Sequence, residues 1–369
     1  MVIRLRNEWK HTDGRSNANG LPGAKSRHVP FLVHVVYFCA KTDGSGKLRM
    51  AKSPKKAAST KRYFANIYPG NDEPLPEAFS SAVLELQNTI NQDVLLLVQN
   101  DSESPYGELG PTVWRSIFEL RKSMKKGKPI GVLLDSPDGY ARESYKIARF
   151  LIRHCGGYSV FVPSYAKSAA TMLALGGDFI LLGNHAELGP IDAQAMSPDE
   201  GRCRSVLDEV QTLERLNAFA LRSLDETMQL LIRRTGMRVD RLLPEAMSFV
   251  DNFVRPLMES IDTTRWTEMS RVLKVGEDYT IRLLKRKYPT QLAESIAREL
   301  ASKYTEHGFV IDAEELEDLA QRLHLDIKAP LALAADDPTI MNGKVEPIFE
   351  KINPFLHKLT AIGFMEPRP

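Results

Sequence analysis

The sequence predicts an α/β protein with a mostly parallel sheet, followed by a helical C-terminal region. Between residues 76 and 200, short apolar runs alternate with longer segments of helical periodicity. The apolar runs end in turn-forming residues, and after residue 200 the helical periodicity continues without them. Strands separated by helices of about ten or more residues are typical of parallel sheets that are covered on both faces.

The core elements follow from this alternation, in chain order. The expected elements are helix Ala78–Ile90, strand Asp93–Gln99, helix Pro111–Lys125, strand Ile130–Leu134, helix Ala141–Ile152, strand Ser159–Val162, helix Ala166–Leu175 and strand Asp178–Leu182. The turn-rich segment 100–110 follows a strand at its carboxyl end, so its Tyr106 is expected to line a cleft.

Five further helices are expected after the core. They are Cys203–Gly236, Pro244–Ser260, Glu277–Lys287, Gln291–Thr305 and Ala313–Leu323. The first carries a long apolar stripe, which predicts burial in the core or in an interface between subunits. Asp312 is the expected N-cap of the last.

Composition changes along the chain predict four regions. Residues 1–75 are expected to form a partly irregular extension in which Phe31–Cys39 and Lys61–Ile67 are short strands or partner contacts. Residues 76–200 are expected to form the α/β core, and residues 201–329 to complete it with helices and oligomer contacts. The tail, residues 330–369, holds six prolines and is expected to be an extended arm.

Ser168 lies where a buried strand turns into a helix made of small residues. Pro163 and Ser164 stop the strand, and Ser168 is expected in the first turn of the helix that starts at Ala166. The unpaired N–H groups and positive dipole end of a helix N-terminus favour the anion that serine attack on a carbonyl creates. The alternative is a serine that only starts the helix.

A second turn, Ser136-Pro137-Asp138-Gly139, follows the strand Ile130–Leu134. Gly139 can adopt a backbone conformation that directs its N–H into a cleft. Because ligands bind at the carboxyl ends of parallel strands, the two turns are expected to face each other. Together they would supply a nucleophile and an oxyanion hole.

Three phrases, SPDG, YAKSAATMLALGGD and ELGPIDAQ, resemble in their order and spacing the serine dehydrogenase proteinase family. That family is related to signal peptide peptidase A and to the Clp protease subunit. The resemblance covers residues 90–200 and extends weakly to EHGFVIDAEELEDL. It implies a ClpP/crotonase-type fold of repeated strand-strand-helix units that assembles into homo-oligomers. It also implies that Ser168 is the nucleophile and that the Ala169 and Gly139 amides are the oxyanion donors.

Two departures bear on activity. Asp138 replaces a glycine of the usual turn, and a carboxylate beside a developing oxyanion repels it unless it points away. Signal peptide peptidases use a lysine base downstream of the serine, whereas this chain has no lysine between Lys167 and Lys274. Arg215 and Arg222 lie in the matching region, and arginine stays protonated.

Four other side chains are weighed for the general base. His185 follows the strand Asp178–Leu182 and is a candidate, with a plain loop histidine as the alternative. Lys167 adjoins the serine but is expected to face solvent. His307 either takes part in the site or caps or packs against the next helix. Asp192 is expected to organise its loop rather than to act as an acid.

Composition excludes several functions. The chain has 369 residues, with 49 basic and 47 acidic ones, so no strong nucleic-acid field is expected. Its three cysteines form no CxxC pair, which argues against a disulfide framework or a zinc site. The sequence contains no phosphate-loop, dinucleotide or metal-ligand motif, so no cofactor and no metal is expected.

A cytoplasmic location is expected because the N-terminus does not read as a secretion signal. No stretch reaches the roughly 20 apolar residues of a membrane span. The favoured function is a serine peptidase-like hydrolase that acts on a peptide or protein substrate through Ser168. The alternatives are an inactive scaffold that binds a peptide or protein, and a crotonase-like acyl-thioester enzyme that needs no serine.

Overall fold

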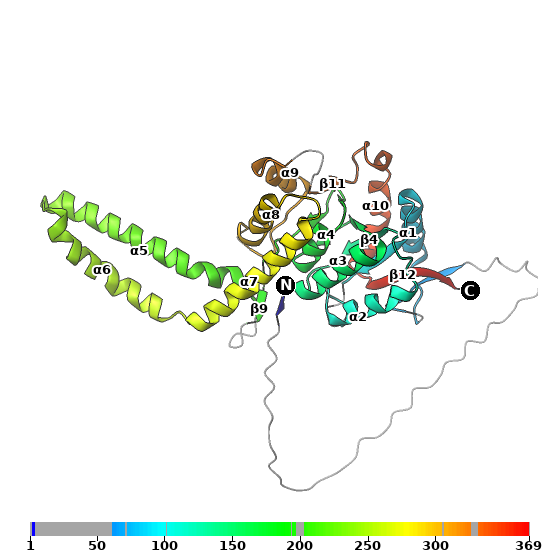
Figure 1. Ribbon diagram of the computed structural model, residues 1–369, viewed down its shortest axis with the longest axis horizontal. Helices are drawn as coiled ribbons and strands as arrows, with labels where there is room; N and C mark the ends of the chain where they lie inside the picture. The colour runs from blue at the N-terminus through cyan, green and yellow to red at the C-terminus, as the bar shows by residue number, and fades with distance from the viewer. Residues whose placement is uncertain are drawn as a thin grey trace, which may run out of the picture. The chain divides into compact units, whose positions relative to one another are not determined.

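A seven-stranded, mostly parallel sheet forms the centre of the structure (Figure 1). The structure, a computed structural model, describes residues 2–3, 61–70, 72–100, 102–192, 194–196, 203–304, 306–325 and 331–368. The expected segment Phe31–Cys39 lies outside them. All elements named below belong to one compact unit of the chain.

The strand order confirms the expected sheet. Neighbouring strands are β11 (Leu333–Ala334), β7 (Ile180–Leu182), β5 (Tyr158–Val162), β4 (Ile130–Asp135), β3 (Val94–Val98), β12 (Ala361–Arg368) and β2 (Arg62–Ala65). From β11 to β3 all pairs are parallel, and β12 runs antiparallel to both β3 and β2.

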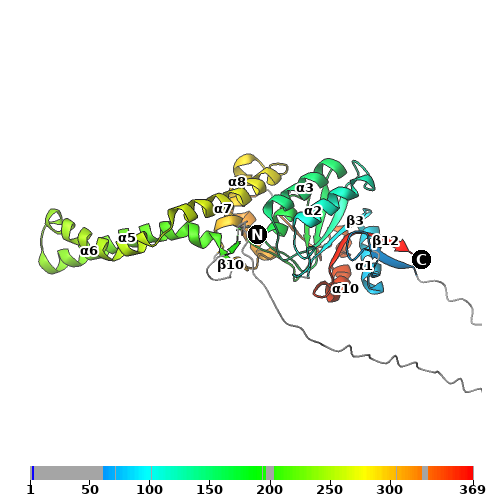
Figure 2. The ribbon, with the colours of Figure 1, turned by 90° about the horizontal axis from the view of Figure 1, so that it is seen from below.

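Helices cover both faces of this sheet (Figure 2). Leu95 and Leu97 of β3 pack in one cluster, while Val94, Leu96 and Val98 pack in the other, as the two-residue period of a strand requires. The first cluster includes residues of α2 (Pro111–Glu119), α3 (Ala141–Cys155) and α4 (Ala169–Leu175). The second includes residues of α1 (Glu77–Ile90) and α10 (Glu346–Leu356).

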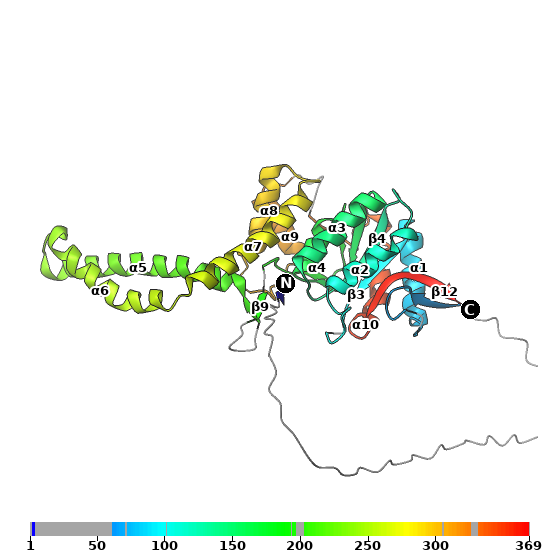
Figure 3. The same ribbon diagram turned by 60° about the horizontal axis from the view of Figure 1, so that its bottom comes forward.

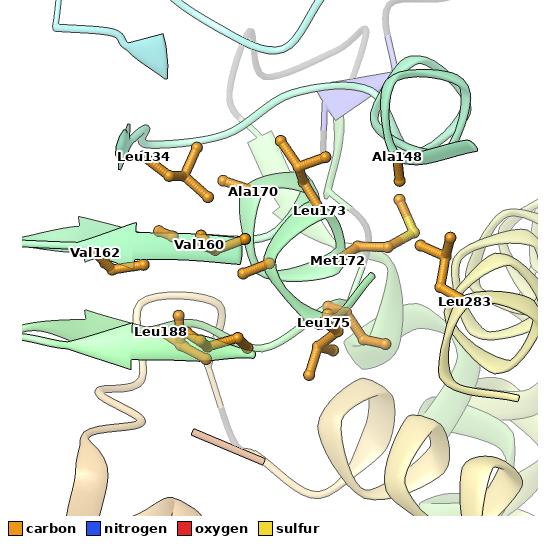
Figure 4. Packing of buried hydrophobic residues seen from close by; sticks show 14 of the residues in the cluster. Leu134, Ala148, Val160, Val162, Ala170, Met172, Leu173, Leu175, Leu188 and Leu283 are labelled. Carbon is orange, nitrogen blue, oxygen red and sulfur yellow. The ribbon is translucent and has the colours of Figure 1, made fainter. Parts of the chain in front are cut away.

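Helix α4 lies in the middle of the first cluster, and all seven of its residues are buried (Figure 4). Leu134 and Val160 approach it from the sheet, Ala148 from α3 and Leu283 from a later helix. The short helix is therefore held by packing, because seven residues are too few to form a stable helix alone.

The C-terminal helices differ in extent from the sequence-based expectation. They are α5 (Val206–Thr235), α6 (Val239–Glu259), α7 (Thr263–Leu284), α8 (Thr290–Ser302) and α9 (Ala313–Arg322). α7 begins far before the expected Glu277, because Asp262 caps it by accepting from the N–H groups of Thr264 and Arg265. Cys203–Ser205, expected in a helix, form the strand β10.

The first residues of α6 and α9 can also be compared with the expectation from the sequence. α6 begins at Val239 rather than at the expected Pro244, so the proline lies inside the helix. Leu242 and Ala246, on either side of it, are buried, and this packing outweighs the lost backbone hydrogen bond. The expected N-cap Asp312 is confirmed, since its carboxylate accepts from the N–H of Glu315 at 2.9 Å.

The tail is not the extended arm that its prolines predict. It contributes β11, the helix α10 and β12, and β12 lies inside the sheet between β3 and β2. Two of its prolines, Pro347 and Pro354, are accommodated within α10, the first of them in the opening turn where no N–H is needed. Sequence alone missed this because the pairing of β12 with β3 joins residues about 260 positions apart.

Among the described helices, none combines the length and the apolar composition that crossing a bilayer requires.

Candidate active site

Three short extended segments lie side by side and bring Ser168, Asp192 and His307 to one end. β6 (Tyr165–Ala166) pairs in parallel with β8 (Glu187–Leu188), and Leu188 forms an antiparallel bridge with Ile311. Because of these directions, the residues after Ala166, those after Leu188 and those before Ile311 all leave by the same end. Ser168, Asp192 and His307 are those residues.

The two turns expected to face each other are hydrogen bonded. The Ser136 N–H donates to the carbonyl of Tyr165 at 3.1 Å, and the Lys167 N–H donates to the carbonyl of Ser136 at 3.0 Å. Gly139 and Ser168 therefore both lie within a few residues of one backbone bridge. This explains why the turn after β4 and the turn before α4 form one site.

Ser168 is the N-cap of α4 rather than a first-turn residue, which corrects the sequence-based expectation. Its φ is 54° and its ψ is −116°, a conformation that a residue with a Cβ rarely adopts. Such strain costs about 1–3 kcal/mol and persists mainly at functional sites. A serine in a sharp strand-to-helix turn is the arrangement of nucleophile elbows. Ser168 is only 1% exposed.

Ala169 and Gly139 supply the amides expected to form the oxyanion hole. Ala169 is the first residue of α4, so its N–H belongs to the turn that has no preceding helical carbonyl. Gly139 lies against Leu109, and a Cβ on it would be 2.5 Å from the Leu109 Cβ. Only glycine fits this position.

Asp138 occupies the Gly139 donor. Its Oδ1 accepts a hydrogen bond from the Gly139 N–H at 2.7 Å. The departure noted in the sequence therefore has a direct structural effect, because the carboxylate points toward the Gly139 N–H, the expected oxyanion donor, rather than away from it. A substrate oxygen must displace this carboxylate to use the Gly139 amide.

Asp192, which is buried, and His307, which is partly buried, form a hydrogen-bonded pair. His307 Nδ1 lies 2.8 Å from Asp192 Oδ1, and the Ser205 hydroxyl donates to Asp192 Oδ2 at 3.1 Å. Because an ionised carboxylate only accepts, Nδ1 carries the proton and Nε2 keeps its lone pair in the neutral ring. Nε2 is buried and has no hydrogen-bond partner among the described residues. The side chain of His307 is 14% exposed.

The positions of Asp192 and His307 differ from the local roles considered for them in the sequence. Among the described residues, the side-chain partners of Asp192 are Ser205 and His307, both distant in sequence, rather than the local turn groups that were expected. His307 lies in the turn before α9 and pairs with Asp192 rather than capping that helix, whose cap is Asp312. A pair separated by 115 residues leaves no local sequence signal.

Lys167 is mostly buried, which corrects the expectation that it faces solvent. Its ammonium forms an ion pair with Glu187 at 2.7 Å and donates to the carbonyls of Leu188 and Phe309, each at 3.3 Å. These three bonds tie the segment before Ser168 to the segments that carry Asp192 and His307. Lys167 therefore holds these segments in place relative to one another.

His185, the other candidate base, is exposed in the turn that follows β7. Its neighbour Asn184 donates a backbone hydrogen bond to Glu346 at 3.1 Å, and His185 is close enough to lower the pKa of that carboxyl, which burial raises. The structure thus places His185 beside α10, whereas the Asp192–His307 pair lies at the end of β8.

Asp135 is a titratable group that the sequence reasoning missed. It ends β4, immediately before the Ser136 turn, and it is fully buried. Burial raises its pKa to about 6, against hydrogen bonds from the Asn100 side chain at 3.0 Å and the Tyr165 N–H at 3.3 Å. An acidic residue closing an apolar strand was the available signal.

A comparison with known families agrees with this geometry. Residues 113–215 match the ClpP-like SDH-type serine proteinases. The match confirms the resemblance drawn from the three sequence phrases. It includes Gly139, Ser168, Ala169 and Asp192 and ends before His307.

Two archaeal relatives from Methanocaldococcus jannaschii are similar to parts of the chain. The uncharacterized protein MJ0137 is 30% identical over 118 residues, which are 30% of this chain and 41% of that protein. The uncharacterized protein MJ1495 is 24% identical over 199 residues, or 54% of this chain and 53% of that protein. The chain thus spans about half or less of these relatives, while the ClpP-like match covers the segment that holds the candidate nucleophile.

Proposed function

We propose that this protein is a serine hydrolase that cleaves peptide or other acyl bonds, with Ser168 as nucleophile and His307 as general base. One observation carries the proposal. His307 is oriented by Asp192 through Nδ1 and keeps a buried, unbonded Nε2 at the end of the segments where Ser168 lies. A base needs this combination of a fixed tautomer and a free lone pair.

Nε2 of His307 removes the Ser168 hydroxyl proton as Oγ bonds to the acyl carbon, and the charge on the carbonyl oxygen is bound by the Ala169 and Gly139 amides. The imidazolium, stabilised by Asp192, then protonates the leaving group as the bond to the acyl carbon breaks. Water then attacks the acyl carbon as His307 takes its proton, and the imidazolium returns that proton to Ser168 Oγ as the ester bond breaks, releasing the acid and the free serine.

The helix start contributes to the same step. The small residues after Ser168 let the first turn of α4 approach a substrate closely, and its dipole favours the developing negative charge. The Ser144 hydroxyl donates to the Ala169 carbonyl at 2.6 Å, which fixes the first residue of α4. Removal of one oxyanion donor typically costs about 10²–10³ in rate.

The test is covalent labelling of Ser168 by a fluorophosphonate, followed by intact mass. We expect labelling of the wild type, none of Ser168→Ala, and labelling slowed by about 10²–10⁴ in His307→Gln, the range of general-base catalysis. His154→Gln is the matched control, because it makes the same change at a histidine in the last turn of α3, away from the Asp192–His307 pair. His185→Gln tests the other histidine. Circular dichroism confirms that each variant is folded.

Two results would contradict parts of the proposal. Labelling of His307→Gln at the wild-type rate rules out His307 as the base, and loss of labelling only in His185→Gln would move that role to His185. Absence of labelling in the folded wild type would contradict the hydrolase itself.

A second function, an inactive scaffold that binds a peptide or protein, is favoured by two observations. Ser168 is buried, and the Gly139 amide is already bonded to Asp138. A scaffold would leave Ser168 unlabelled even when Asp138 is replaced by glycine. For the proposed hydrolase we propose a peptide or protein substrate and a cytoplasmic location.

A further inference from the structure

A groove of about 590 Å³ lies at the surface between α2 and α3, and Figure 3 shows these two helices next to each other. Its volume is in the range of ligand-binding pockets. Of the described residues that line it, four are basic and none is acidic. The basic ones are Arg121, Lys146, Arg149 and Arg153. We call this feature the α2–α3 groove, and its charge favours a negatively charged ligand.

Positive charge is concentrated around the α2–α3 groove, although the chain as a whole is nearly neutral, with a net charge of +2. Residues 111–128 and 141–155 contain ten basic and two acidic residues. One of the two acids, Glu143, is buried. Charge of one sign gathered in this way attracts ligands of the opposite sign and speeds their association.

The basic side chains of α3 follow one line along the helix. At about 100° per residue, Arg142, Lys146, Arg149 and Arg153 fall within about 60° of one another around the helix axis. Glu143 pairs with Arg142 at 3.0 Å and with Lys146 at 3.3 Å. Within the described part of the chain, Arg149 and Arg153 have no carboxylate at ion-pair distance. The line therefore has charge that an added carboxylate can neutralise.

Two arginines of the groove are held against aromatic rings. Arg121 Cζ lies 4.2 Å from the centre of the Phe118 ring, and Nη1 of this arginine donates to the Phe118 carbonyl at 2.9 Å. Arg149 Cζ lies 5.9 Å from the ring centre of Tyr145, which also stacks on Tyr279 at 4.4 Å. A guanidinium fixed in this way loses little freedom on binding, and its other N–H groups can still bind a carboxylate.

The ring contacts also decide which kind of anion fits. Nucleic-acid bases bind by stacking on the faces of aromatic rings. In the groove the face of Phe118 is covered by Arg121, and Phe150 stacks on His154 at 5.2 Å. Carboxylates need no free ring face, because they bind a guanidinium through two parallel hydrogen bonds. The groove therefore suits a chain of carboxylates better than a single-stranded nucleic acid.

We propose that the α2–α3 groove binds an acidic segment of the peptide or protein substrate, with the carboxylates of that segment on the basic line of α3. Binding of the acidic segment is a property of the groove alone. Only the statement that the bound peptide is a substrate rests on the proposed hydrolase.

The basic line begins close to the candidate active site. Arg142 follows Gly139 by three residues, so the two Cα atoms are at most about 11 Å apart. From Arg142 to Arg153 the line is about 17 Å long, which is the length of about five residues of an extended peptide. A run of acidic residues beside the bond to be cleaved would occupy this line.

The first test measures peptide binding to the full chain carrying Ser168→Ala, so that cleavage does not interfere. The probe is a fluorescent peptide with five glutamates in the middle and ten uncharged residues on each side, and the matched peptide has five glutamines instead. In fluorescence anisotropy we expect the glutamate peptide to bind at least about tenfold more tightly than the glutamine peptide. High salt should weaken its binding.

The second test uses variants that change the net charge equally. Arg149→Glu with Arg153→Glu should weaken binding of the glutamate peptide about tenfold, because two exposed attractive pairs become repulsive. Lys122→Glu with Lys126→Glu is the matched control, since both lysines are exposed and do not line the groove. It should weaken binding less than about threefold. Circular dichroism confirms that each variant is folded.

The third test connects binding to cleavage in chains that keep Ser168. The wild type should cleave the glutamate peptide at least about ten times faster than the glutamine peptide, as measured by mass spectrometry. Arg149→Glu with Arg153→Glu should remove this preference. The same variant should react with the fluorophosphonate at the wild-type rate, because that small probe does not reach the groove.

Four results would overturn the proposal. Equal weakening by the two double variants would show that net charge alone acts, and equal binding of the two peptides would show no preference for carboxylates. Tighter binding of a single-stranded oligonucleotide or of anionic phospholipid vesicles than of the glutamate peptide would assign the groove to another partner. Peptide binding without cleavage by a wild type that is labelled at Ser168 would show that the acidic peptide is not a substrate. Failure of the hydrolase itself would differ, because Ser168 would then stay unlabelled while Ser168→Ala still bound the peptide.

Discussion

Replacing Asp138 by glycine should activate the site. In the native structure the Asp138 carboxylate accepts from the Gly139 N–H at 2.7 Å, so the amide is occupied before a substrate arrives. Hydrogen bonds to a charged group contribute about 1.5–3 kcal/mol. If the carboxylate must leave before the oxyanion can bind, its removal should raise the rate of Ser168 labelling by about 10- to 100-fold.

The backbone of the turn should survive this change. The Asp138 carbonyl, which accepts from the Leu109 N–H at 3.2 Å, remains in Asp138→Gly. The added glycine costs at most about 1 kcal/mol of unfolding free energy. Asp138→Asn is the matched control, because its amide oxygen still accepts from Gly139 but carries no charge, so we expect a smaller gain.

The assay is the second-order rate constant of fluorophosphonate labelling, measured by intact mass on wild type, Asp138→Gly and Asp138→Asn. Equal rates in all three would refute the idea that Asp138 blocks the donor. A slower Asp138→Gly would indicate that the carboxylate helps catalysis instead.

Three other predictions concern stability and positioning. Burial raises the Asp135 pKa to about 6, so the folded state keeps a proton that the unfolded chain loses near pH 4. As the pH rises from 4 to 6, this group should therefore lower the unfolding free energy by about 3 kcal/mol. Urea denaturation at several pH values should show a flatter dependence of the unfolding free energy on pH in Asp135→Asn, and identical dependences would contradict the raised pKa. Gly139→Ala should lower the unfolding free energy by about 1–3 kcal/mol more than Gly127→Ala. Gly127 is the control because it also has a positive φ, but no atom lies within 4 Å of an added Cβ. Equal losses in urea denaturation would show that Leu109 can move away from the added Cβ at no cost in stability. Ser205→Ala removes both the N-cap of α5 and a hydrogen bond to Asp192. It should lower the unfolding free energy by about 1 kcal/mol and slow the labelling of Ser168 several-fold. Unchanged labelling would show that the bond to His307 is enough to hold Asp192 in place.

Local pattern located Ser168, the proposed nucleophile, but not its backbone conformation. The apolar strand, the Pro163 stop and the run of small residues are sequence-local, so they placed Ser168 at a strand-to-helix turn. Whether Ser168 belongs to the first turn or to the cap depends on the bonds between Ser136 and the segment 165–167. Those bonds link different parts of the chain, and they pull Ser168 out of the helix.

The tail and the proposed general base show the same limit of local sequence reasoning. Proline content argued for an extended arm, yet α10 tolerates Pro347 and Pro354, and β12 pairs with β3 because that buries Ala361 and Ile362. His185 drew attention as the histidine nearest in sequence to the serine helix. His307, much farther along, is the one that Asp192 orients.

The sequence by itself determined the α/β class, most core strands and helices, the resemblance to the ClpP-like serine proteinases and the place of Ser168 at a strand-to-helix turn, because periodicity, turn residues and contiguous motifs are local properties. Only the tertiary structure decided that Asp192 pairs with His307, that Lys167 is buried in an ion pair and that Asp138 bonds to the Gly139 amide. These depend on strand register and on side-chain direction. Both arise when distant segments pack together, and neither is written in any one stretch of the chain.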